Sequence, residues 1–532
     1  MRGVWLVWVA IFVGVAACVA VILDEPSHVA KLGFADGMMN ADMLWPASFV
    51  WDVTTRGDGW RGHSLSRLPS LFPDVTVWGS LALITRSVRW TILLYGVLQA
   101  SAFVTIGGWL AARFAGRTWV AGASAVFAVM ASLVALALAH VGGRLFVSSE
   151  VLPIIHFGPM LLSLLAAALV ARWSSGVGST WAILGVSILV FLSDELLLIE
   201  FVLPLLFASV GLCAAGRMLP SRALGRAVTL VAGTLIGRQA IIVLRHAGVH
   251  LDHQPFIEGA AIIRSIHKFV ADVPRLIAGQ PIFATLVAIA AVTFVGIGWW
   301  IAVQVNRQST DRTVGGERMF LWLFAAATTA GAIVFTACFY DDATSLRYLV
   351  AVWAWGVVAL AAAALRIPGA AYAATPVAAL TVGVSLFEYA VVDHGAVAVL
   401  NWDLDVAACV RSRQGPLDLH AGLAGYWVAR PAEMALRWST QIDQVTPTGI
   451  AYPWNSDALW FRESLADPAR PPVYDFIVMR ELDTAAIVAR YGRPDTVVPC
   501  ADTALWVYRD RAALSARVAE TWPPPDLKHH QP

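Results

Sequence analysis

Residues 23–78 read LDEPSHVAKLGFADGMMNADMLWPASFVWDVTTRGDGWRGHSLSRLPSLFPDVTVW and directly follow the first hydrophobic run of the chain. Seven carboxylates lie in this stretch: Asp24, Glu25, Asp36, Asp42, Asp52, Asp58 and Asp74. Aromatic and basic side chains are interleaved with them: Trp45, Trp51, Trp60, Arg61, His63 and Arg67. Because apolar runs dominate the rest of the chain, so dense a polar segment predicts a large loop at a membrane surface.

The composition sets the class of protein. Of 532 residues, 58% are hydrophobic and 14% charged, and the mean hydropathy is +0.68. A soluble chain carries about 25% charged residues, so we expect a polytopic α-helical membrane protein. The net charge is +1 and no basic domain or stripe stands out, which argues against nucleic-acid binding.

Hydrophobic runs long enough to cross a bilayer recur about eleven times. The predicted spans are 3–23, 88–112, 119–140, 155–171, 179–193, 196–216, 227–244, 281–303, 319–339, 347–365 and 372–391. Residues 15–18 (VAAC) resemble a lipoprotein cleavage box, but the apolar run continues to residue 23. We therefore interpret the first run as an uncleaved transmembrane helix.

Charge is sorted between alternate connections of these spans. One set carries the basic residues Arg113, Arg117, Arg172, Arg217, Arg222, Arg226, Arg307, Arg312, Arg318 and Arg366. Beside the opening stretch, the other set holds Glu150, Asp194, Glu195, Asp252, Glu258, Asp272, Asp341 and Asp342. The positive-inside rule then predicts a cytoplasmic (inner) membrane protein with a cytoplasmic N-terminus and an outer, periplasmic or extracellular, C-terminal domain.

Two domains follow: a transmembrane domain over 1–392, with its first outer loop at 24–78, and a soluble domain over 393–532. In the latter, PVYDFIVMREL predicts a buried strand, DTAAIVARYG a helix ending at Gly492, and DTVVPCADTALWVYRD two strands around a turn. This is a small α/β or α+β domain. Cys409 and Cys500 are a candidate disulfide if the domain faces an oxidising compartment.

The first outer loop is the strongest candidate for chemistry. SLSRLPSLFPD places Leu65, Leu68, Leu71 and Phe72 at helical spacing, which predicts a short amphipathic helix at the interface. Arg61, His63 and Arg67 could hold an anionic phosphate beside a carboxylate. The alternative is a loop that only caps the bundle with solvated acids.

Other outer connections supply further substrate-binding candidates. Asp194 and Glu195 lie between two spans with almost no loop, where charges usually face a cavity, although a polar surface turn is the alternative. Arg347 and Tyr348 follow two acids at one helix entrance, where an ion pair that only stabilises the turn is the competing interpretation. Arg238 either reaches the interface or binds lipid phosphate.

A metal site has weaker support in the sequence. The connection 246–280 carries His250, Asp252, His253 and Glu258, a conceivable divalent-metal set, but such histidines more often pack or face water. The chain lacks zinc-spaced His/Cys clusters, a phosphate-binding GxxxxGK[ST] loop, a strand–helix GxGxxG and a GxSxG elbow. No cofactor is assigned, and a divalent metal remains open.

The layout resembles the GT-C superfamily of polytopic glycosyltransferases, which use polyprenyl-phosphate-linked sugars. The matching segments are ADMLWPASFVWDV, GW and SRLPSLFPD in the first loop, and AGLAGYWVARP, YDFIVM and CADTALWVY in the tail. The resemblance implies an inverting transfer on the outer face, with an acid of the first loop as general base. Asp42 matches best and Asp36 next, while Asp74 would position substrate.

The expected function is therefore transfer of a sugar from a polyprenyl-phosphate donor to a glycan, lipid or protein acceptor at the bilayer. Two alternatives remain open. One is a transporter or flippase for a glycolipid or polysaccharide, which would need ionisable residues along a mid-membrane path. The other is a non-catalytic scaffold in envelope polysaccharide assembly, with the outer domain as its binding module.

Overall fold

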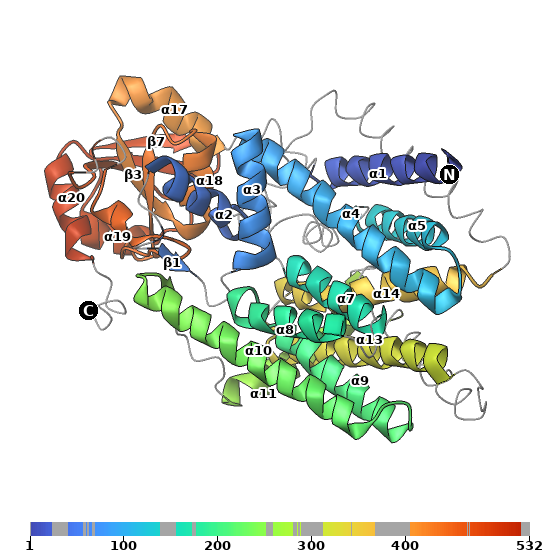
Figure 1. The fold of residues 1–532 in the computed structure, drawn as a ribbon. Helices are drawn as coiled ribbons and strands as arrows, with labels where there is room; N and C mark the ends of the chain where they lie inside the picture. The colour runs from blue at the N-terminus through green and yellow to red at the C-terminus, as the bar shows by residue number, and fades with distance from the viewer. Residues whose placement is uncertain are drawn as a thin grey trace. The chain divides into compact units, whose positions relative to one another are not determined.

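Two compact units make up the chain in the computed structural model (Figure 1). The structure describes residues 2–23, 41–56, 60, 63–65, 70–138, 156–172, 177–251, 259–279, 285, 288, 312–341, 343–367, 405–464, 467 and 469–522. The first unit comprises Met1–Glu25, Leu68–Val243 and Gln254–Val397. The second comprises Pro26–Arg67, Leu244–His253 and Ala398–Pro532, so it is larger than the C-terminal segment alone.

Apolar helices build the first unit. Four are long and apolar enough to cross a membrane: Val88–Ala115, Pro220–His246, Gly316–Cys338 and Ser345–Ala364. They correspond to α4 (Val88–Ala115), α10 (Pro220–His246), α13 (Arg312–Cys338), and η6 (Ala343–Leu349) with α14 (Val350–Ala364). Six shorter apolar helices accompany them, including Val4–Ala20, Trp119–Val134 and Phe157–Arg172. These helices indicate a membrane-embedded protein.

The remaining helices of this unit follow the predicted hydrophobic runs closely. They are α1 (Arg2–Leu23), α5 (Trp119–Leu138), α7 (Phe157–Arg172), α8 (Val177–Leu192), η5 (Leu198–Val202) and α9 (Leu203–Ala214). The weakest predictions, on either side of Ser193 and at 227–244, correspond to α8, α9 and α10. The predicted spans 281–303 and 372–391 lie almost entirely outside the described residues.

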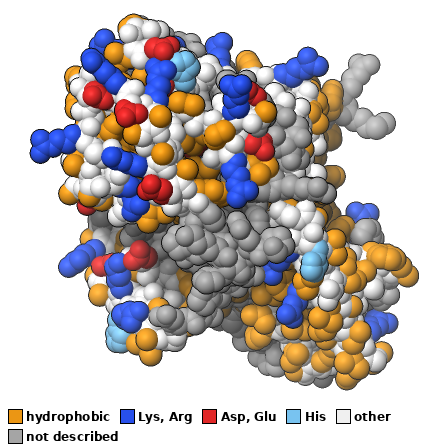
Figure 2. Space-filling model, turned by 90° about the vertical axis from the view of Figure 1, so that its left-hand side faces the viewer, with side chains coloured by type: hydrophobic (Ala, Val, Ile, Leu, Met, Phe, Trp, Pro, Cys, Tyr) orange, Lys and Arg blue, Asp and Glu red, His pale blue; other side chains and the backbone are white. Residues whose placement is uncertain are grey.

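Large apolar side chains cover the exposed surface of α10. They are Leu224, Val228, Val231, Leu235, Ile236 and Val243. Figure 2 shows a similar difference on one face of the molecule. One region mixes Lys, Arg, Asp and Glu with apolar side chains, and another is rich in hydrophobic side chains with a few Lys, Arg and His among them. An apolar surface of this extent is costly in water and suits contact with lipid.

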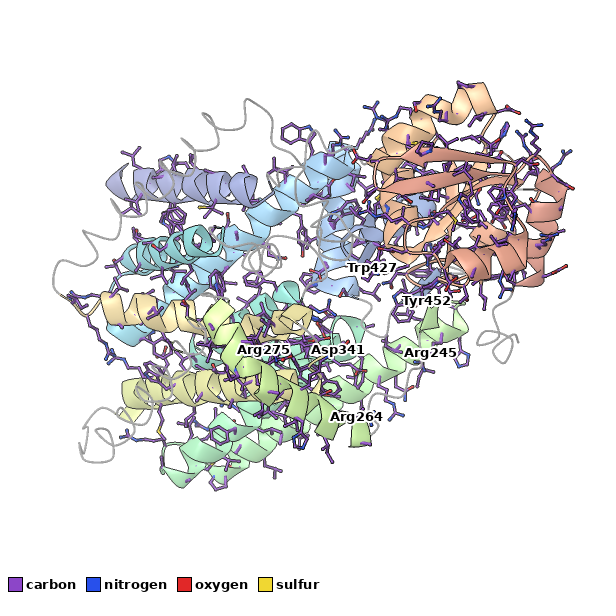
Figure 3. All side chains as sticks on the ribbon, turned by 180° about the vertical axis from the view of Figure 1, so that it is seen from behind. Arg245, Arg264, Arg275, Asp341, Trp427 and Tyr452 are labelled. Atoms are coloured by element: carbon purple, nitrogen blue, oxygen red, sulfur yellow. A yellow bond between two sulfur atoms is a disulfide. The ribbon has the colours of Figure 1, made fainter. Side chains whose placement is uncertain are left out.

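The connection at 246–280 contains a helix that the sequence analysis did not predict. α11 (Gly259–Gly279) packs on α13 and carries Arg264 and Arg275, while Asp341 follows the end of α13 (Figure 3). Lys268 Nζ lies 3.0 Å from Asp341 Oδ1. Apolar residues at a spacing of three and four positions give α11 one apolar face. This pattern indicates a helix less clearly than the uniform apolar runs of the other helices.

The prediction of a short amphipathic helix around Leu65–Phe72 is wrong. Leu65 ends a strand, β1 (His63–Leu65), whereas Leu71 begins a π-helical turn, η4 (Leu71–Val75), followed by α3 (Thr76–Thr85). Ser70 has a left-handed backbone (φ 44°), and Phe72 is extended (φ −138°, ψ 133°). Pro69 and Pro73 lack amide hydrogens, so this stretch cannot complete a regular helical ladder.

A mixed five-stranded sheet is the centre of the second unit. Its strands are β3 (Ala421–Gly425), β4 (Gln441–Val445), β6 (Tyr474–Val478), β7 (Thr496–Cys500) and β8 (Thr503–Val507), in the spatial order β4-β3-β6-β8-β7. β4, β3 and β6 are parallel, and β8 runs antiparallel to β6 and β7. The predicted strand in PVYDFIVMREL, the helix before Gly492 and the final strand pair are confirmed.

Helices cover both faces of this sheet. α17 (Asp405–Leu417) and α18 (Tyr426–Ala435) pack through Val410, Val428 and Ala432 against Ile442 and Phe476. On the other face, α19 (Thr484–Tyr491) and α20 (Arg511–Glu520) supply Ile487, Leu514 and Val518 to a second core with Leu423 and Ile477. The parallel strands are buried along their whole length, including the polar residues Gln441, Asp443 and Gln444 of β4 and Asp475 of β6.

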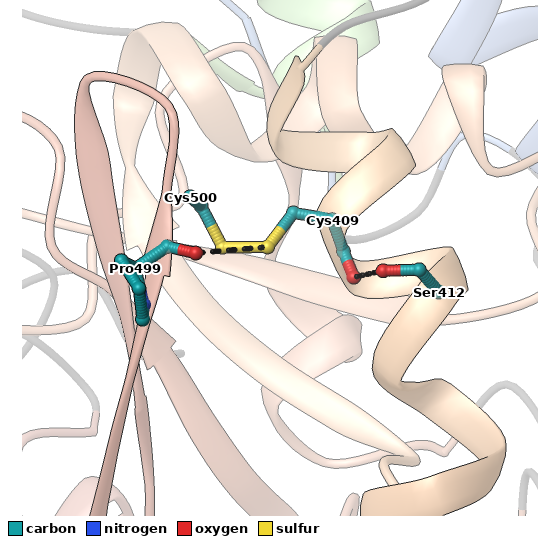
Figure 4. Close-up of a disulfide and its surroundings, with 4 residues drawn as sticks. All are labelled: Cys409, Ser412, Pro499 and Cys500. Carbon is teal, nitrogen blue, oxygen red and sulfur yellow. Dashed lines mark hydrogen bonds between the residues drawn. A yellow bond between two sulfur atoms is a disulfide. The ribbon is translucent and has the colours of Figure 1, made fainter.

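A disulfide joins Cys409 of α17 to Cys500 at the end of β7 (Figure 4). Their Cα atoms lie 5.8 Å apart, and the residues are separated by 91 positions in the sequence. The bond closes a loop that contains most of the sheet, so it limits the freedom of the unfolded chain.

Part of the segment 24–78, the predicted first outer loop, belongs to this second unit. α2 (Ala41–Trp51) packs on α18, and the Trp51 ring stacks on Trp438 with centroids 4.3 Å apart. A small sheet joins β1 to β2 (His250–Leu251) and β5 (Ser456–Asp457). Three distant segments of the sequence therefore meet in one folded unit.

Glycine permits the close crossing of α4 and α5. A Cβ at Gly108 would lie 2.5 Å from Ala123 Cα, and a Cβ at Gly122 would overlap the Gly108 carbonyl oxygen. Small residues let transmembrane helices approach backbone to backbone. A Cβ at Gly185 of α8, in contrast, would meet no atom within 4 Å.

We expect Gly122→Ala to lower the stability of the first unit by on the order of 1–3 kcal/mol, because the helices must separate to admit the methyl group. Gly185→Ala is the matched control and should be neutral or slightly stabilising, since alanine favours the helix. Thermal unfolding in detergent micelles measures both. Equal melting temperatures for the two variants would contradict the close crossing.

Candidate functional site

Polar side chains from several segments meet in the first unit. The Ser70 amide donates to the Ser193 carbonyl oxygen at 2.9 Å, which joins the η4 turn to the turn after α8. A Cβ at Gly158 would overlap Asp74 Oδ1, so the start of α7 lies directly against Asp74. These contacts bring together turns that are more than 80 residues apart in the sequence.

A buried histidine–aspartate pair lies within this group. His156 Nδ1 and Asp194 Oδ2 form a short hydrogen bond, and their exposed fractions are 8% and 1%. The other oxygen, Asp194 Oδ1, accepts a 2.8 Å hydrogen bond from the Leu196 amide. Both carboxylate oxygens are therefore held in place, and the carboxylate in turn fixes the imidazole ring.

The backbone of His156 also has an unusual conformation. Its φ of 61° is in the left-handed region, which a residue with a Cβ adopts at a cost of about 1–3 kcal/mol. The surrounding contacts must compensate for that cost. The conformation presents the ring to Asp194 just before α7 begins at Phe157.

Aromatic and cationic groups adjoin the pair. The Tyr348 ring lies 5.2 Å from the His156 ring, and the Arg347 guanidinium lies 5.3 Å from the centre of the Tyr348 ring. Arg347 Nη2 also donates to the Tyr348 hydroxyl at 3.5 Å. Tyr348 therefore lies in contact with both the His156 imidazole and the Arg347 guanidinium.

A second carboxylate lies close by on η4. Asp74 is fully buried, and its Oδ1 accepts a short hydrogen bond from the hydroxyl of Tyr95 in α4. The ring of Tyr95 is itself 3% exposed. The contact of Asp74 with Gly158, two residues after His156, connects the two polar pairs.

Glu200 is a third buried acid of this unit, with an exposed fraction of 2%. It lies in the π-helical turn η5, a geometry often found at functional sites. Its backbone oxygen accepts hydrogen bonds from Ser163 Oγ at 2.7 Å and Thr328 Oγ1 at 3.3 Å. These contacts fix the backbone of the turn that follows Asp194.

The structure thus brings together four predicted substrate-binding residues: Asp74, Asp194, Arg347 and Tyr348. Glu195 is half-buried in the same turn as Asp194, whereas Arg238 is exposed on α10. His63 lies in the second unit, on β1. The disulfide pair Cys409 and Cys500 is bonded there as well.

The predicted catalytic acids fall largely outside the described residues. The backbone of Asp42 is in α2, but its side chain is outside the described part, and Asp36, Arg61 and Arg67 lie wholly outside it. The same holds for Asp252, His253 and Glu258 of the conceivable metal set, whose His250 lies on β2.

Sequence reasoning missed His156, Tyr95 and Glu200. His156 follows the apolar residues of LPII and precedes Phe-Gly-Pro, a helix-start pattern. A lone histidine or tyrosine in an apolar run is usually a packing residue. The distinguishing signal here is a tertiary one, the carboxylate that each side chain meets.

In comparisons with known proteins, no family model, curated protein or solved structure matches the chain.

Tyr95→Phe tests the Asp74 contact. Removing a donor from a buried carboxylate should destabilise the first unit by about 1–3 kcal/mol. Tyr340→Phe is the matched comparison, because the Tyr340 hydroxyl donates over a longer 3.3 Å to Asp272, whose side chain is 26% exposed. Thermal unfolding should show the larger loss in Tyr95→Phe, and the reverse order would contradict this assignment.

Proposed function

We propose that the chain is an inverting membrane glycosyltransferase that moves a sugar from a polyprenyl-phosphate donor to an acceptor hydroxyl. The observation that supports this most directly is the buried His156–Asp194 pair, with Arg347 and Tyr348 beside it. A histidine oriented by a carboxylate is a general base. An adjacent guanidinium suits a phosphate leaving group.

In this proposal Asp194 holds the Nδ1 proton of His156, which leaves Nε2 as the basic atom of the ring. Nε2 takes the proton of the acceptor hydroxyl as its oxygen attacks the anomeric carbon. The bond from that carbon to the lipid phosphate oxygen breaks, and the phosphate leaves with the electron pair. Attack opposite the leaving group inverts the configuration of the sugar.

Charge develops on the departing phosphate during this step. Arg347 would stabilise it, since a guanidinium offers paired donors to phosphate oxygens. Stacking on Tyr348 limits the conformations of the Arg347 side chain before substrate binds. The sugar–phosphate bond supplies the driving force, so the proposal needs no nucleotide-binding site.

The substrate suits a membrane-embedded chain. A polyprenyl tail partitions into the bilayer, and exposed apolar side chains on α10 indicate lipid contact. The resemblance of the sequence to GT-C enzymes supports the same substrate class. The proposal includes the orientation expected from the charge pattern, with the N-terminus in the cytoplasm and the reaction at the outer face of the inner membrane.

His156→Gln tests the proposed base. In cells that lack the native chain, wild-type protein should restore the glycosylated product, and His156→Gln should lower the transfer rate by about 100-fold or more. His267→Gln is the matched control, because His267 is exposed on α11. Mass spectrometry of extracted polyprenyl-linked sugars and glycan products measures donor and product together.

Three results would overturn this function. One is an unchanged lipid-linked sugar pool and unchanged glycans when the chain is absent. Another is full transfer by His156→Gln at normal protein levels, which would exclude His156 as the base. A third is loss of transfer in Asp42→Asn with His156→Gln fully active, which would return the base to the first outer loop.

A further inference from the structure

The second unit contains a histidine flanked by two carboxylates. His63 Nε2 lies 3.5 Å from Asp52 Oδ2 and 3.6 Å from Asp457 Oδ2. One ligand atom from each of the three side chains lies within 4.8 Å of the other two. The exposed fractions are 0% for Asp52, 1% for His63 and 0% for Asp457.

Among the described residues, these separations exceed those of two other histidine–aspartate contacts. His156 and Asp194 form a short hydrogen bond, and His420 Nδ1 lies 3.1 Å from Asp475 Oδ2. The His63 separations are close to the 3.5 Å between His420 Nε2 and Asp418 Oδ1, but those two side chains are 57% and 73% exposed. A charged imidazole normally approaches a carboxylate to about 2.7–2.9 Å. The imidazole of His63 instead lies at a longer distance from two carboxylates.

The wider spacing matches donor atoms around a metal ion. Bonds of about 2.0–2.1 Å in a tetrahedral shell place neighbouring donor atoms roughly 3.4 Å apart. The distances of 3.5 and 3.6 Å from His63 Nε2 are close to that spacing. Two carboxylates and one imidazole form a donor set that suits zinc or manganese.

The backbone positions two of the three donors. His63 of β1 pairs with Asp457 of β5 in an antiparallel register, so their side chains are cross-strand neighbours on one face. Asp457 Oδ1 accepts a 2.8 Å hydrogen bond from the Leu459 amide and caps the 3-10 turn η7 (Ala458–Phe461). That bond turns Oδ2 of Asp457 toward His63.

The third donor, Asp52, comes from a different part of the N-terminal segment that contains His63. Asp52 begins the π-helical turn η3 (Asp52–Arg56) at the end of α2. The Phe49 ring packs edge-on against His63, with centroids 4.9 Å apart. The contact fixes the imidazole plane, as packing around metal ligands commonly does.

A buried ion-pair network lies beside the three residues. Arg430 is the only arginine or lysine among the buried residues that the structure describes in this unit. It pairs with Glu433, and its Nη2 lies 3.6 Å from Asp443 Oδ1. Burial and the charge of Asp443 raise the pKa of Tyr474 well above its usual value, so Tyr474 donates to Asp443 as a neutral phenol.

Several buried carboxylates cluster in the described part of this unit. The hydroxyl of Ser456 accepts a 3.0 Å hydrogen bond from Arg430 Nη2. Asp457 is the next residue in the sequence, so Asp52 and Asp457 add two carboxylates beside the Arg430 network. Burial of a carboxylate costs hydration, which nearby positive charge or hydrogen-bond donors offset. A divalent ion would balance the two carboxylates and use the neutral imidazole as its third ligand.

We propose that Asp52, His63 and Asp457 bind one divalent transition-metal ion of the zinc or manganese class. The ion joins a segment of the first outer loop to the C-terminal domain. The ligands His63 and Asp457 are separated by nearly 400 residues, so the ion would close a very long loop and stabilise the folded unit. This site is independent of the proposed transferase chemistry of the first unit.

Metal analysis of the full chain tests this proposal. Protein is produced in medium containing zinc and manganese, purified in detergent without a polyhistidine tag, and analysed by inductively coupled plasma mass spectrometry. We expect about one ion per chain in the wild type, because the donors form a single site. His63→Gln and Asp52→Asn should lower this content at least about tenfold, since each removes a ligand.

Matched controls separate ligand loss from general effects. His420→Gln changes another histidine of the second unit that adjoins carboxylates, but its side chain is 57% exposed. Asp467→Asn changes an aspartate whose side chain is 51% exposed. Both controls should keep the wild-type metal content. Asp52→Asn also covers the case in which His63→Gln fails to fold.

Chelation provides a measurement that does not depend on variants. Removing the ion from wild-type protein should lower the melting temperature by about 3–8 °C, and adding zinc or manganese should restore it. The ion that restores the higher value identifies the metal. Metal-free wild-type protein with no response to either ion, or full metal content in His63→Gln and Asp52→Asn, would overturn the proposal.

Discussion

The cost of removing carboxylates from water governs the polar architecture of this chain. A buried carboxylate is tolerated only when a proton donor or a cation compensates for lost hydration. Most of the buried acids in the described residues lie beside such a group or in a cluster that would attract one. These are Asp74 with Tyr95, Asp194 with His156, Asp475 with His420, Glu433 and Asp443 with Arg430, and Asp52 and Asp457 with His63. The kind of group beside each buried acid, a proton donor or a cation, is the basis for the two chemical roles proposed for this chain.

The sequence predicts most of the helices because the signal is local. Continuous apolar runs such as that of α4 define a membrane helix by composition and length. The parallel strand β6 is equally visible, since its residues are apolar on both faces. α11 escapes the same reasoning because its apolar residues cover one face only. The prediction at Leu65–Phe72 is wrong because the leucines have helical spacing. The strand β1 that forms there depends on pairing with β2 and β5, which the local sequence does not show.

The candidate site is predictable only in part, for a physical reason. Asp74, Asp194 and Arg347 are visible in the sequence because a charge in an apolar setting needs an explanation. His156 and Tyr95 are not, because each gains its meaning from a carboxylate that is distant in the sequence. The same limit applies to Asp457, which looks like an ordinary turn residue until its pairing with His63 in the small sheet is known.

The opening stretch of acids is therefore not one site. Asp52 belongs to the second unit and Asp74 to the first, so the density of carboxylates in the sequence combines two separate requirements. In the first unit a histidine forms a hydrogen bond with one carboxylate, which orients its imidazole ring. In the second unit another histidine is spaced from two carboxylates at the separation of metal ligands. The same residue types thus support different chemistry, and the spacing between their donor atoms is what distinguishes the two cases.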